Sequence, residues 1–296
     1  MAARARRPRS PEVARPSIFW LLAAIAAGPV TALFKYDIRG ELPRTGPFIL
    51  TPNHYSDIDP VVMGWAVWRL GRAPRFMAKA SLFRIPVIGR LLHWSGQIPV
   101  ERERGKAKQA ALSAAEHLVE TGRGVIVYPE GTLTREPAGW PMRGKSGAVR
   151  IALAEDIPVI PIASWGADAV VPRFQRKLRL RWRAPITIRV GEPIDLSAYR
   201  GRAHSRTAIE EATTIVMREI TALLEEIRGE TAPAELYDPV KHSQTEFGMP
   251  VATVPAAEPV AAPSAETVEA PAAEPVEAPD PSTPATASEP DETARA

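Results

Sequence analysis

Two residues that could share a proton, His54 and Asp59, lie five positions apart in the chain. The apolar residues 47–50 before them predict a short buried strand, and residues 61–67 after them predict a helix. His54 is therefore expected on a strand-to-helix turn that can fold its imidazole back onto the Asp59 carboxylate. An imidazole can take a proton from a hydroxyl near neutral pH, and a carboxylate on its other nitrogen fixes the tautomer. Such a pair could activate an alcohol, which need not belong to the protein itself.

The same residues have a purely structural interpretation. Ser56 and Asp59 match a helix capping box, with Ser56 at the N-cap and Asp59 near the third helical position. Asp59 would then only complement the helix dipole. Because a histidine and an aspartate occur at this spacing by chance in many chains, the two residues alone favour the structural interpretation.

Composition narrows the chemistry. The 296 residues include no cysteine, which excludes disulfides and thiolate nucleophiles, and the five histidines show no metal-ligand spacing, so we expect no metal. The chain carries a net charge of +3 and residues 249–296 carry −8, so residues 1–248 carry +11. A basic body of this kind suits nucleic acid, an anionic membrane or a phosphorylated substrate.

Strands and helices alternate along residues 35–230, which indicates one α/β domain. The apolar patterns predict strands at 34–42, 47–50, 75–79, 96–102, 124–128, 157–162, 178–182 and 186–190, and helices at 106–120, 145–154 and 205–228. Outside this domain, the basic residues 1–16 and the acidic, Pro/Ala/Glu-rich residues 231–296 cannot bury a core, and we expect them to be disordered.

Residues 17–34 form an apolar stretch with no charge inside it. As a helix the stretch would be about 27 Å long, which is marginal for crossing a bilayer, and Gly28-Pro29 interrupts it. A signal peptide and a buried core helix are both compatible with this pattern. We favour a membrane-associated helix in the interface, with Phe19 and Trp20 at the level of the headgroups.

Two further stretches are expected at the surface. Residues 81–92 mix apolar side chains with two arginines and predict an amphipathic lip, with a packed turn and helix as the alternative. Arg179, Arg181 and Arg183 share one face of the predicted strand 178–182. A charged edge strand is the favoured interpretation of these arginines, and a surface for anionic lipid is the alternative.

Four separated pieces of sequence decide between the two interpretations of His54. They are, in order, Asn53-His54-x-Ser56-x-x-Asp59, Gly96-Gln97-Ile98-Pro99-Val100-Glu101-Arg102, Tyr128-Pro129-Glu130-Gly131-Thr132 and Val159-Ile160-Pro161. With these pieces the chain resembles the glycerolipid acyltransferases, in particular the 1-acyl-glycerol-3-phosphate acyltransferases, over about residues 35–230. A further pattern of that family is matched by Lys79, Phe83, Pro86 and Gly89. The resemblance implies a single acyltransferase domain with a mixed, mostly parallel sheet flanked by helices.

The resemblance also implies a mechanism. His54 is the general base that deprotonates the acceptor hydroxyl, and Asp59 orients the imidazole. The hydroxyl oxygen attacks an acyl thioester, and coenzyme A or acyl carrier protein leaves. The reaction then requires no cofactor and no nucleophile from the protein.

By the same resemblance, Arg102 and the turn Glu130-Gly131-Thr132 hold the phosphate of the acceptor. Lys79 and Arg135 are further candidates for substrate binding. An arginine offers a fork of donors to phosphate oxygens, and a glycine turn offers backbone N–H groups. Without the family context, Arg102 would be interpreted as the ion-pair partner of a neighbouring glutamate, and the glycine as an ordinary turn residue.

Two departures from the family pattern concern the acceptor. Leu133 stands where the family usually has an arginine, and the nearest arginine is Arg135. Pro99 and Glu101 stand where the family usually has an aromatic residue and an aspartate. The acceptor is thus less constrained by the resemblance than the chemistry is.

The expected function is acyl transfer to the sn-2 hydroxyl of 1-acyl-glycerol-3-phosphate, giving phosphatidic acid at the cytoplasmic face of the cell membrane. The expected partners are this phosphorylated acceptor, an acyl thioester carried by coenzyme A or acyl carrier protein, and an anionic membrane surface. The alternatives are another lysophospholipid or lipid alcohol as the acceptor, and a peripheral lipid-binding protein without turnover. Nucleic-acid binding ranks last, because the basic body shows no aromatic platform for bases.

Overall fold

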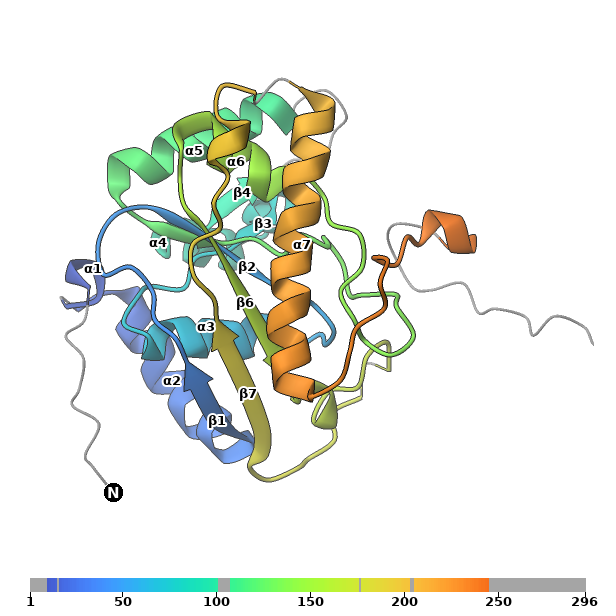
Figure 1. The fold of residues 1–296 in the computed structure, drawn as a ribbon. Coiled ribbons are helices and arrows are strands. Elements are labelled where there is room, and N and C mark those ends of the chain that lie inside the picture. Colours follow the sequence, from blue (N-terminus) through green and yellow to red (C-terminus); the bar gives the residue numbers. More distant parts are fainter. Residues whose placement is uncertain (1–9, 15, 101–106, 176, 203–204, 245–296) are drawn as a thin grey trace, which may run out of the picture. The chain divides into compact units, whose positions relative to one another are not determined.

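The computed structural model describes residues 10–14, 16–100, 107–175, 177–202 and 205–244, which form an α/β fold (Figure 1). Within these residues the main sheet has the strand order β1 (Phe34–Arg39), β7 (Ala184–Val190), β6 (Val159–Trp165), β2 (Phe48–Pro52) and β5 (Gly124–Ile126). Strands β6 and β7 are antiparallel, and the other neighbours are parallel. The prediction of a mixed, mostly parallel sheet is therefore confirmed.

Helices and a second, smaller sheet complete the described fold. The helices are α1 (Pro11–Ala14), α2 (Ile18–Leu33), α3 (Asp59–Arg69), α4 (Ile88–Trp94), α5 (Ala107–Thr121), α6 (Gly147–Glu155) and α7 (Arg206–Arg228). The short 3-10 segments are η1 (Ala80–Arg84), η2 (Ala167–Ala169), η3 (Ser197–Tyr199) and η4 (Val240–His242). In the smaller sheet β3 (Met77–Lys79) pairs in parallel with β4 (Ile98–Val100).

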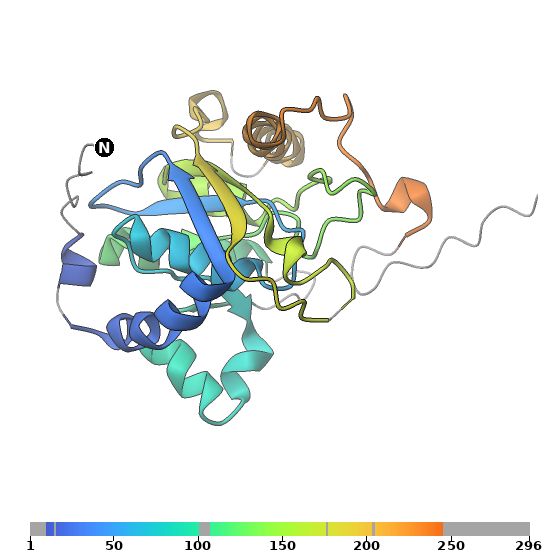
Figure 2. The same cartoon turned by 90° about the horizontal axis from the view of Figure 1, so that it is seen from below.

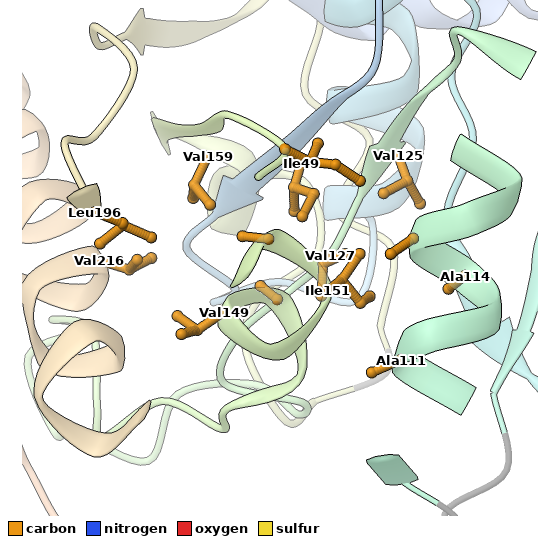
Figure 3. Packing of buried hydrophobic residues seen from close by; sticks show 14 of the residues in the cluster. Ile49, Ala111, Ala114, Val125, Val127, Val149, Ile151, Val159, Leu196 and Val216 are labelled. Atoms are coloured by element: carbon orange, nitrogen blue, oxygen red, sulfur yellow. The ribbon is translucent and has the colours of Figure 1, made fainter. Parts of the chain in front are cut away.

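Side chains that alternate along the strands build one core on each face of the main sheet. Ile49, Val125 and Val159 face helices α5, α6 and α7, as the close view of this cluster shows (Figure 3). Leu50 and Ile160 point the other way, into a core that includes α3 and the end of α2. Seen from below, α7 (orange-brown) and α2 (dark blue) lie on opposite sides of the sheet (Figure 2). The sheet is thus covered by helices on both faces.

Helix α7 confirms the helix predicted at 205–228. Its N-cap is Ser205, whose Oγ accepts a hydrogen bond from Ala208 N at 3.3 Å, and its C-cap is Gly229, with φ +66°. The buried face includes Ile209, Ile220 and other apolar residues at helical spacing. Burying each large apolar side chain contributes about 1.5–3 kcal/mol, so this face holds the helix on the sheet.

Helix α2 is packed more closely than the prediction of an interfacial helix required. Phe19 is buried against α1 and α3, so its predicted place at the level of the headgroups is wrong. Trp20 is partly exposed and donates from Nε1 to Val13 O at 3.2 Å. The helix also continues through Pro29. No helix in the described part of the chain has both the length and the apolar character needed to cross a membrane.

The structure places part of each end that the composition predicted to be disordered. Residues 10–14 include α1, where Glu12 forms ion pairs with Arg72 and Arg75. Residues 231–244 are also placed, because Tyr237 O accepts from Arg143 N at 2.8 Å. The other residues of both predicted ends lie outside the described part, apart from position 16.

The strand predicted at 178–182 is wrong. The backbone there is not in a strand, because Arg179 N donates to Val170 O and Arg183 N donates to Ala32 O, neither of which belongs to a strand. Pro161 likewise lies inside β6, although the sequence predicts a strand limited by its prolines. Pro161 O accepts from Gly191 N, just past the end of β7, so its missing N–H faces no strand residue.

Candidate active site

Three loops meet where neighbouring parallel strands end. His54 lies in the loop after β2, the turn 129–132 follows β5, and residues 166–171 follow β6. Both β5 and β6 pair with β2 in parallel, so the carboxyl ends of all three strands lie at the same edge of the sheet. In open α/β sheets this edge is the usual position of a ligand site.

The His54 imidazole and the Asp59 carboxylate are in contact. His54 Nδ1 lies 3.0 Å from Asp59 Oδ2, and 17% of the His54 side chain but only 1% of the Asp59 side chain is exposed. The Nδ1 atom faces the carboxylate, so Nε2 is the nitrogen that remains for a substrate. This is the geometry of a base oriented by a buried acid.

The capping interpretation of Asp59 also holds in part. Oδ2 accepts hydrogen bonds from Tyr55 N at 2.7 Å and from Ser56 N at 2.8 Å, as in the backbone half of a capping box. Helix α3 nevertheless begins at Asp59, two residues later than a Ser56 N-cap required. The Ser56 hydroxyl instead donates to Val171 O at 2.7 Å. One carboxylate therefore shapes the turn and orients the imidazole.

The His54 loop is fixed to the strand beside it through Asn53. The Asn53 side chain donates to Ser164 O at 3.0 Å and accepts from Ser164 N at 2.9 Å. His54 O accepts from Thr134 N at 2.7 Å. Asn53 belongs to the recognised motif, but nothing in the sequence predicted this bond, because its partner lies 111 residues away.

Glu130 contacts the backbone of the His54 loop and also lines an open pocket. Its side chain is fully buried, Oε1 accepts from His54 N at 2.9 Å, and Oε2 accepts from Met142 N at 3.1 Å. Burial raises the pKa of the carboxyl group to about 7, and the two backbone N–H groups act in the opposite direction. Both carboxylate oxygens thus accept backbone N–H groups of this region, and contact of Glu130 with a substrate stays a prediction.

The binding roles predicted for Gly131 and Thr132, the other residues of the turn, stay predictions. Gly131 has φ +71°, and a Cβ there would lie 3.2 Å from Lys145 Cδ, so the turn requires glycine. Thr132 is half-buried. An open pocket of about 450 Å³ borders this turn, and Lys145 and Arg143 are among its lining residues. Lys145 is thus a cation beside the turn that the family motifs did not include.

The predicted basic residues have different outcomes. Arg102 lies outside the described residues. Lys79 is the last residue of β3, which pairs with β4 in the smaller sheet. Arg135 is only 4% exposed, and burial lowers the pKa of its guanidinium group. Contact of any of these three with a phosphate therefore stays a prediction.

Aromatic side chains enclose the His54 loop. The centroid of the Tyr128 ring lies 4.3 Å from that of the His54 ring. The Phe76 ring stacks parallel to Tyr128, with 6.4 Å between the ring centroids. Tyr55 stacks on Trp165 at 4.7 Å, and its hydroxyl accepts from Ala167 N. These contacts join residues more than 50 positions apart, so no local pattern could have indicated them.

The last turn of α7 braces the same region through Arg228. Its guanidinium carbon lies 3.9 Å from the Trp140 ring centroid and 4.4 Å from the Trp165 ring centroid. Nη1 donates to Ala138 O at 3.0 Å. The loop after the 129–132 turn and the end of β6 are thereby tied to one helix.

Replacing Arg228 by alanine should lower the free energy of unfolding by about 2–3 kcal/mol, because each ring contact of a desolvated cation contributes about 0.5–2 kcal/mol. Chemical denaturation measures this, with Arg218→Ala, an exposed position on the same helix, as the control. An Arg228→Ala variant as stable as the Arg218→Ala variant would show that the ring contacts contribute nothing.

Comparisons with known proteins agree with this geometry. The family model described as Acyltransferase matches residues 34–165. The chain is 32% identical over 155 residues to the chloroplastic 1-acyl-sn-glycerol-3-phosphate acyltransferase BAT2 of Brassica napus, covering 51% of this chain and 42% of that protein. It is 30% identical over 154 residues to the lyso-ornithine lipid O-acyltransferase of Pseudomonas aeruginosa, covering 51% of this chain and 54% of that protein. The chain thus spans about half the length of these two curated relatives or less.

A solved structure supports the fold. The crystal structure of the 1-acyl-sn-glycerophosphate acyltransferase PlsC from Thermotoga maritima is similar, with a TM-score of 0.52 and 19% identity. The similarity covers 72% of this chain and 81% of that one. The matched family segment contains β2, β5, the His54 loop and the turn after β5. Residues 34–165 therefore form a domain of the Acyltransferase family, and 1-acyl-sn-glycerol-3-phosphate acyltransferases are among its relatives.

Proposed function

We propose that this chain transfers a fatty acyl group from a thioester to the sn-2 hydroxyl of 1-acyl-glycerol-3-phosphate, giving phosphatidic acid. The observation that carries the proposal is the 3.0 Å contact between His54 Nδ1 and the buried Asp59 carboxylate, inside a domain of the Acyltransferase family. Binding alone does not need a base with an oriented imidazole, so the pair favours turnover over a passive lipid-binding role.

The mechanism follows from the orientation of the imidazole. His54 Nε2 takes the proton of the acceptor hydroxyl while its oxygen attacks the thioester carbonyl carbon. The tetrahedral intermediate collapses by breaking the carbon–sulfur bond, and the imidazolium returns the proton to the departing thiolate. Asp59 stabilises the imidazolium through Nδ1. A positioned base of this kind contributes about 10²- to 10⁴-fold to the rate.

We place the phosphate of the acceptor at the turn after β5. Gly131 lets a ligand approach the backbone, the Thr132 hydroxyl is a further donor, and Lys145 brings a positive charge beside them. By resemblance Arg102 would complete this set. The acyl donor is an acyl thioester of coenzyme A or of acyl carrier protein. It acts as a co-substrate, and we propose no bound cofactor.

We also place the protein at the cytoplasmic face of a membrane, peripheral or shallowly embedded. The lipid acceptor and the phosphatidic acid product both reside in the bilayer. Helix α2 exposes Leu21 and Ile25 on one side, at the spacing of one helical turn. The positive charge of residues 1–248 favours an anionic surface.

A second acceptor class has support of its own. One relative is named for lyso-ornithine lipid, which carries no phosphate, and Leu133 replaces the arginine expected in the phosphate motif. The same dyad would acylate such an acceptor. The competing proposal thus differs only in the group that binds beside the turn.

The test is transfer of a labelled acyl group, from acyl-coenzyme A and from acyl carrier protein, to a panel of acceptors. The panel contains 1-acyl-glycerol-3-phosphate, its dephosphorylated form, lysophosphatidylglycerol and a lyso-ornithine lipid. We expect the phosphorylated monoacyl acceptor to be used with the highest kcat/KM. Preference for lyso-ornithine lipid would establish the second proposal instead, and no transfer to any acceptor would leave a lipid-binding role.

Replacing Arg102 by alanine should raise the KM for 1-acyl-glycerol-3-phosphate about tenfold or more with little change in kcat, because a charge-assisted hydrogen bond to phosphate is lost. The KM for the dephosphorylated acceptor should not change. Initial-rate kinetics with both acceptors measure this, with Arg218→Ala as the control. An equal rise in KM for both acceptors would remove Arg102 from the phosphate site.

A further inference from the structure

The segment 177–183, between η2 and β7, alternates cations with large apolar side chains. Its sequence is Lys177-Leu178-Arg179-Leu180-Arg181-Trp182-Arg183. The apolar residues are far from buried, with exposed fractions of 58% for Leu178, 85% for Leu180 and 75% for Trp182. Exposed apolar side chains that gather in one place mark surfaces that contact a membrane or another molecule. We call this segment the basic–apolar loop.

The second feature of the basic–apolar loop is its set of four cations. Within the part of the chain that the structure describes, no carboxylate forms an ion pair with Lys177, Arg181 or Arg183. Arg179 donates to the neutral side chain of Gln175 at 3.2 Å. Seven residues therefore present four positive charges to solvent.

The absence of a strand decides where these side chains point. In the predicted strand, arginines would share one face and the apolar side chains would be packed on the other. In the structure the loop has no strand partner, and every residue of the segment is exposed. Cations and apolar side chains are therefore both exposed to solvent along the whole segment, as interfacial segments require.

The loop is joined to the helix proposed to contact the membrane. Arg183 N donates to Ala32 O at 2.9 Å, in the last turn of α2. The loop and this end of α2 lie together beside the start of β7 (Figure 1). The exposed residues Leu21 and Ile25 of α2 continue the apolar character along the helix. The loop therefore extends a surface that already has apolar side chains.

We propose that the basic–apolar loop is an anchor for anionic lipid, in which Leu178, Leu180 and Trp182 enter the headgroup boundary and the four cations bind headgroup phosphates. Trp is favoured at that boundary, and each cation near an anionic surface contributes about 1 kcal/mol. The two leucines fit acyl chains and offer no stacking face to a base, which favours lipid over nucleic acid. The anchor extends the proposed membrane location, but it does not depend on turnover.

Vesicle flotation of the full chain, without any acyl donor, tests the anchor. The vesicles contain phosphatidylcholine alone or phosphatidylcholine with phosphatidylglycerol. We expect the parent chain to bind the anionic vesicles more tightly and this preference to weaken in high salt. Arg179→Gln/Arg181→Gln should bind anionic vesicles about 30-fold more weakly, the factor that two such charges represent. Leu180→Ser/Trp182→Ser should weaken binding roughly tenfold or more.

Matched controls separate the anchor from other effects. Arg189, on the following strand β7, forms ion pairs with Asp37 and Glu226 and is therefore not used as a control. Arg218 is exposed on α7, so Arg218→Gln is the charge control. Because all loop positions are exposed, we expect both double variants to unfold at the same temperature as the parent chain. Either double variant binding anionic vesicles like the Arg218→Gln chain would overturn the proposal. So would tighter binding to single-stranded RNA than to anionic vesicles. Failure here leaves the acyl-transfer proposal untouched, because no turnover is measured.

Discussion

Replacing His54 by alanine should lower kcat for acyl transfer by about 10²- to 10⁴-fold, the contribution of a positioned general base. The imidazole is held by Asp59 Oδ2 at 3.0 Å and is the group that would accept the proton of the acceptor hydroxyl. Its side chain is partly exposed at the end of β2 and contributes little to either core, so the variant should fold normally.

Steady-state rates with 1-acyl-glycerol-3-phosphate and acyl-coenzyme A measure this effect, together with a thermal unfolding curve. His117→Ala is the control, because His117 is exposed on α5 and far along the chain from the three loops of the site. A His54→Ala variant with the turnover of the His117→Ala variant would remove the imidazole from the chemistry. Loss of activity with loss of the folded state would leave the role of His54 to the more conservative His54→Gln variant.

Replacing Glu130 by glutamine should lower kcat by about 10²-fold while the protein stays folded. The carboxylate accepts one backbone N–H at each oxygen, from His54 and from Met142. An amide has only one oxygen, so its NH2 group would face the other N–H and push the His54 backbone away. Small displacements of a catalytic group have effects of this size on the rate, and kcat should fall more than KM rises.

Glu136→Gln is the matched control for this prediction. Glu136 is also a buried glutamate of the same loop region, but only its Oε2 accepts a backbone N–H, from Trp140 at 2.8 Å. A glutamine oxygen can replace that single acceptor. Equal values of kcat for the two variants would show that Glu130 does not position His54.

The Glu130→Gln variant should gain stability relative to the parent chain as pH rises. The folded-state pKa of Glu130 is raised from 4.5 to about 7, so folding favours the protonated carboxyl group. The stabilisation is fully present below pH 4.5 and is lost as pH rises through about 7. The free energy of unfolding of the variant, relative to that of the parent chain, should therefore rise by about 3 kcal/mol between pH 4 and pH 8. Denaturation at a series of pH values tests this, and a constant difference would contradict the assigned pKa.

This combination distinguishes a positioning role from a structural one. If the only role of a residue is structural, breaking its hydrogen bonds should make the protein less stable. Glu130 instead combines a buried charge that is unfavourable for stability with a hydrogen bond to the backbone of His54. Less active and more stable variants are the usual outcome at such positions.

Local patterns were sufficient for the parts of the site that lie within one turn. His54 and Asp59 could be paired from the sequence because the strand-to-helix turn keeps them close, and the 3.0 Å contact agrees with that inference. Helix α7 could be placed because its cap at Ser205 and its apolar spacing are both local signals. The roles of these residues in catalysis remain proposals.

Contacts between distant segments could not be predicted. The direction of the Glu130 side chain depends on Met142 and on the His54 backbone, which no spacing reveals. The Arg228 contact with Trp140 and Trp165 joins three separate elements. The motif match indicated that Glu130 is important, but its orientation, and therefore its role, required the fold.

The alternating pattern at 178–182 shows the opposite failure. Alternation of Leu178, Arg179 and Leu180 satisfies the rule for a strand, but a strand also needs a partner with free backbone groups. Here Arg179 N and Arg183 N are bonded to a loop and to the end of α2. The pattern that predicted a charged edge strand therefore belongs to an exposed loop.

One measurement tests the central claim most directly: the release of coenzyme A from acyl-coenzyme A by the full chain, with and without 1-acyl-glycerol-3-phosphate, combined with analysis of the lipid product. The proposal predicts that thiol release depends on the acceptor and equals the phosphatidic acid formed. It also predicts that phospholipase A2 removes the new acyl group, because that group is at sn-2. Thiol release without acceptor, or an acyl group at another position, would contradict it.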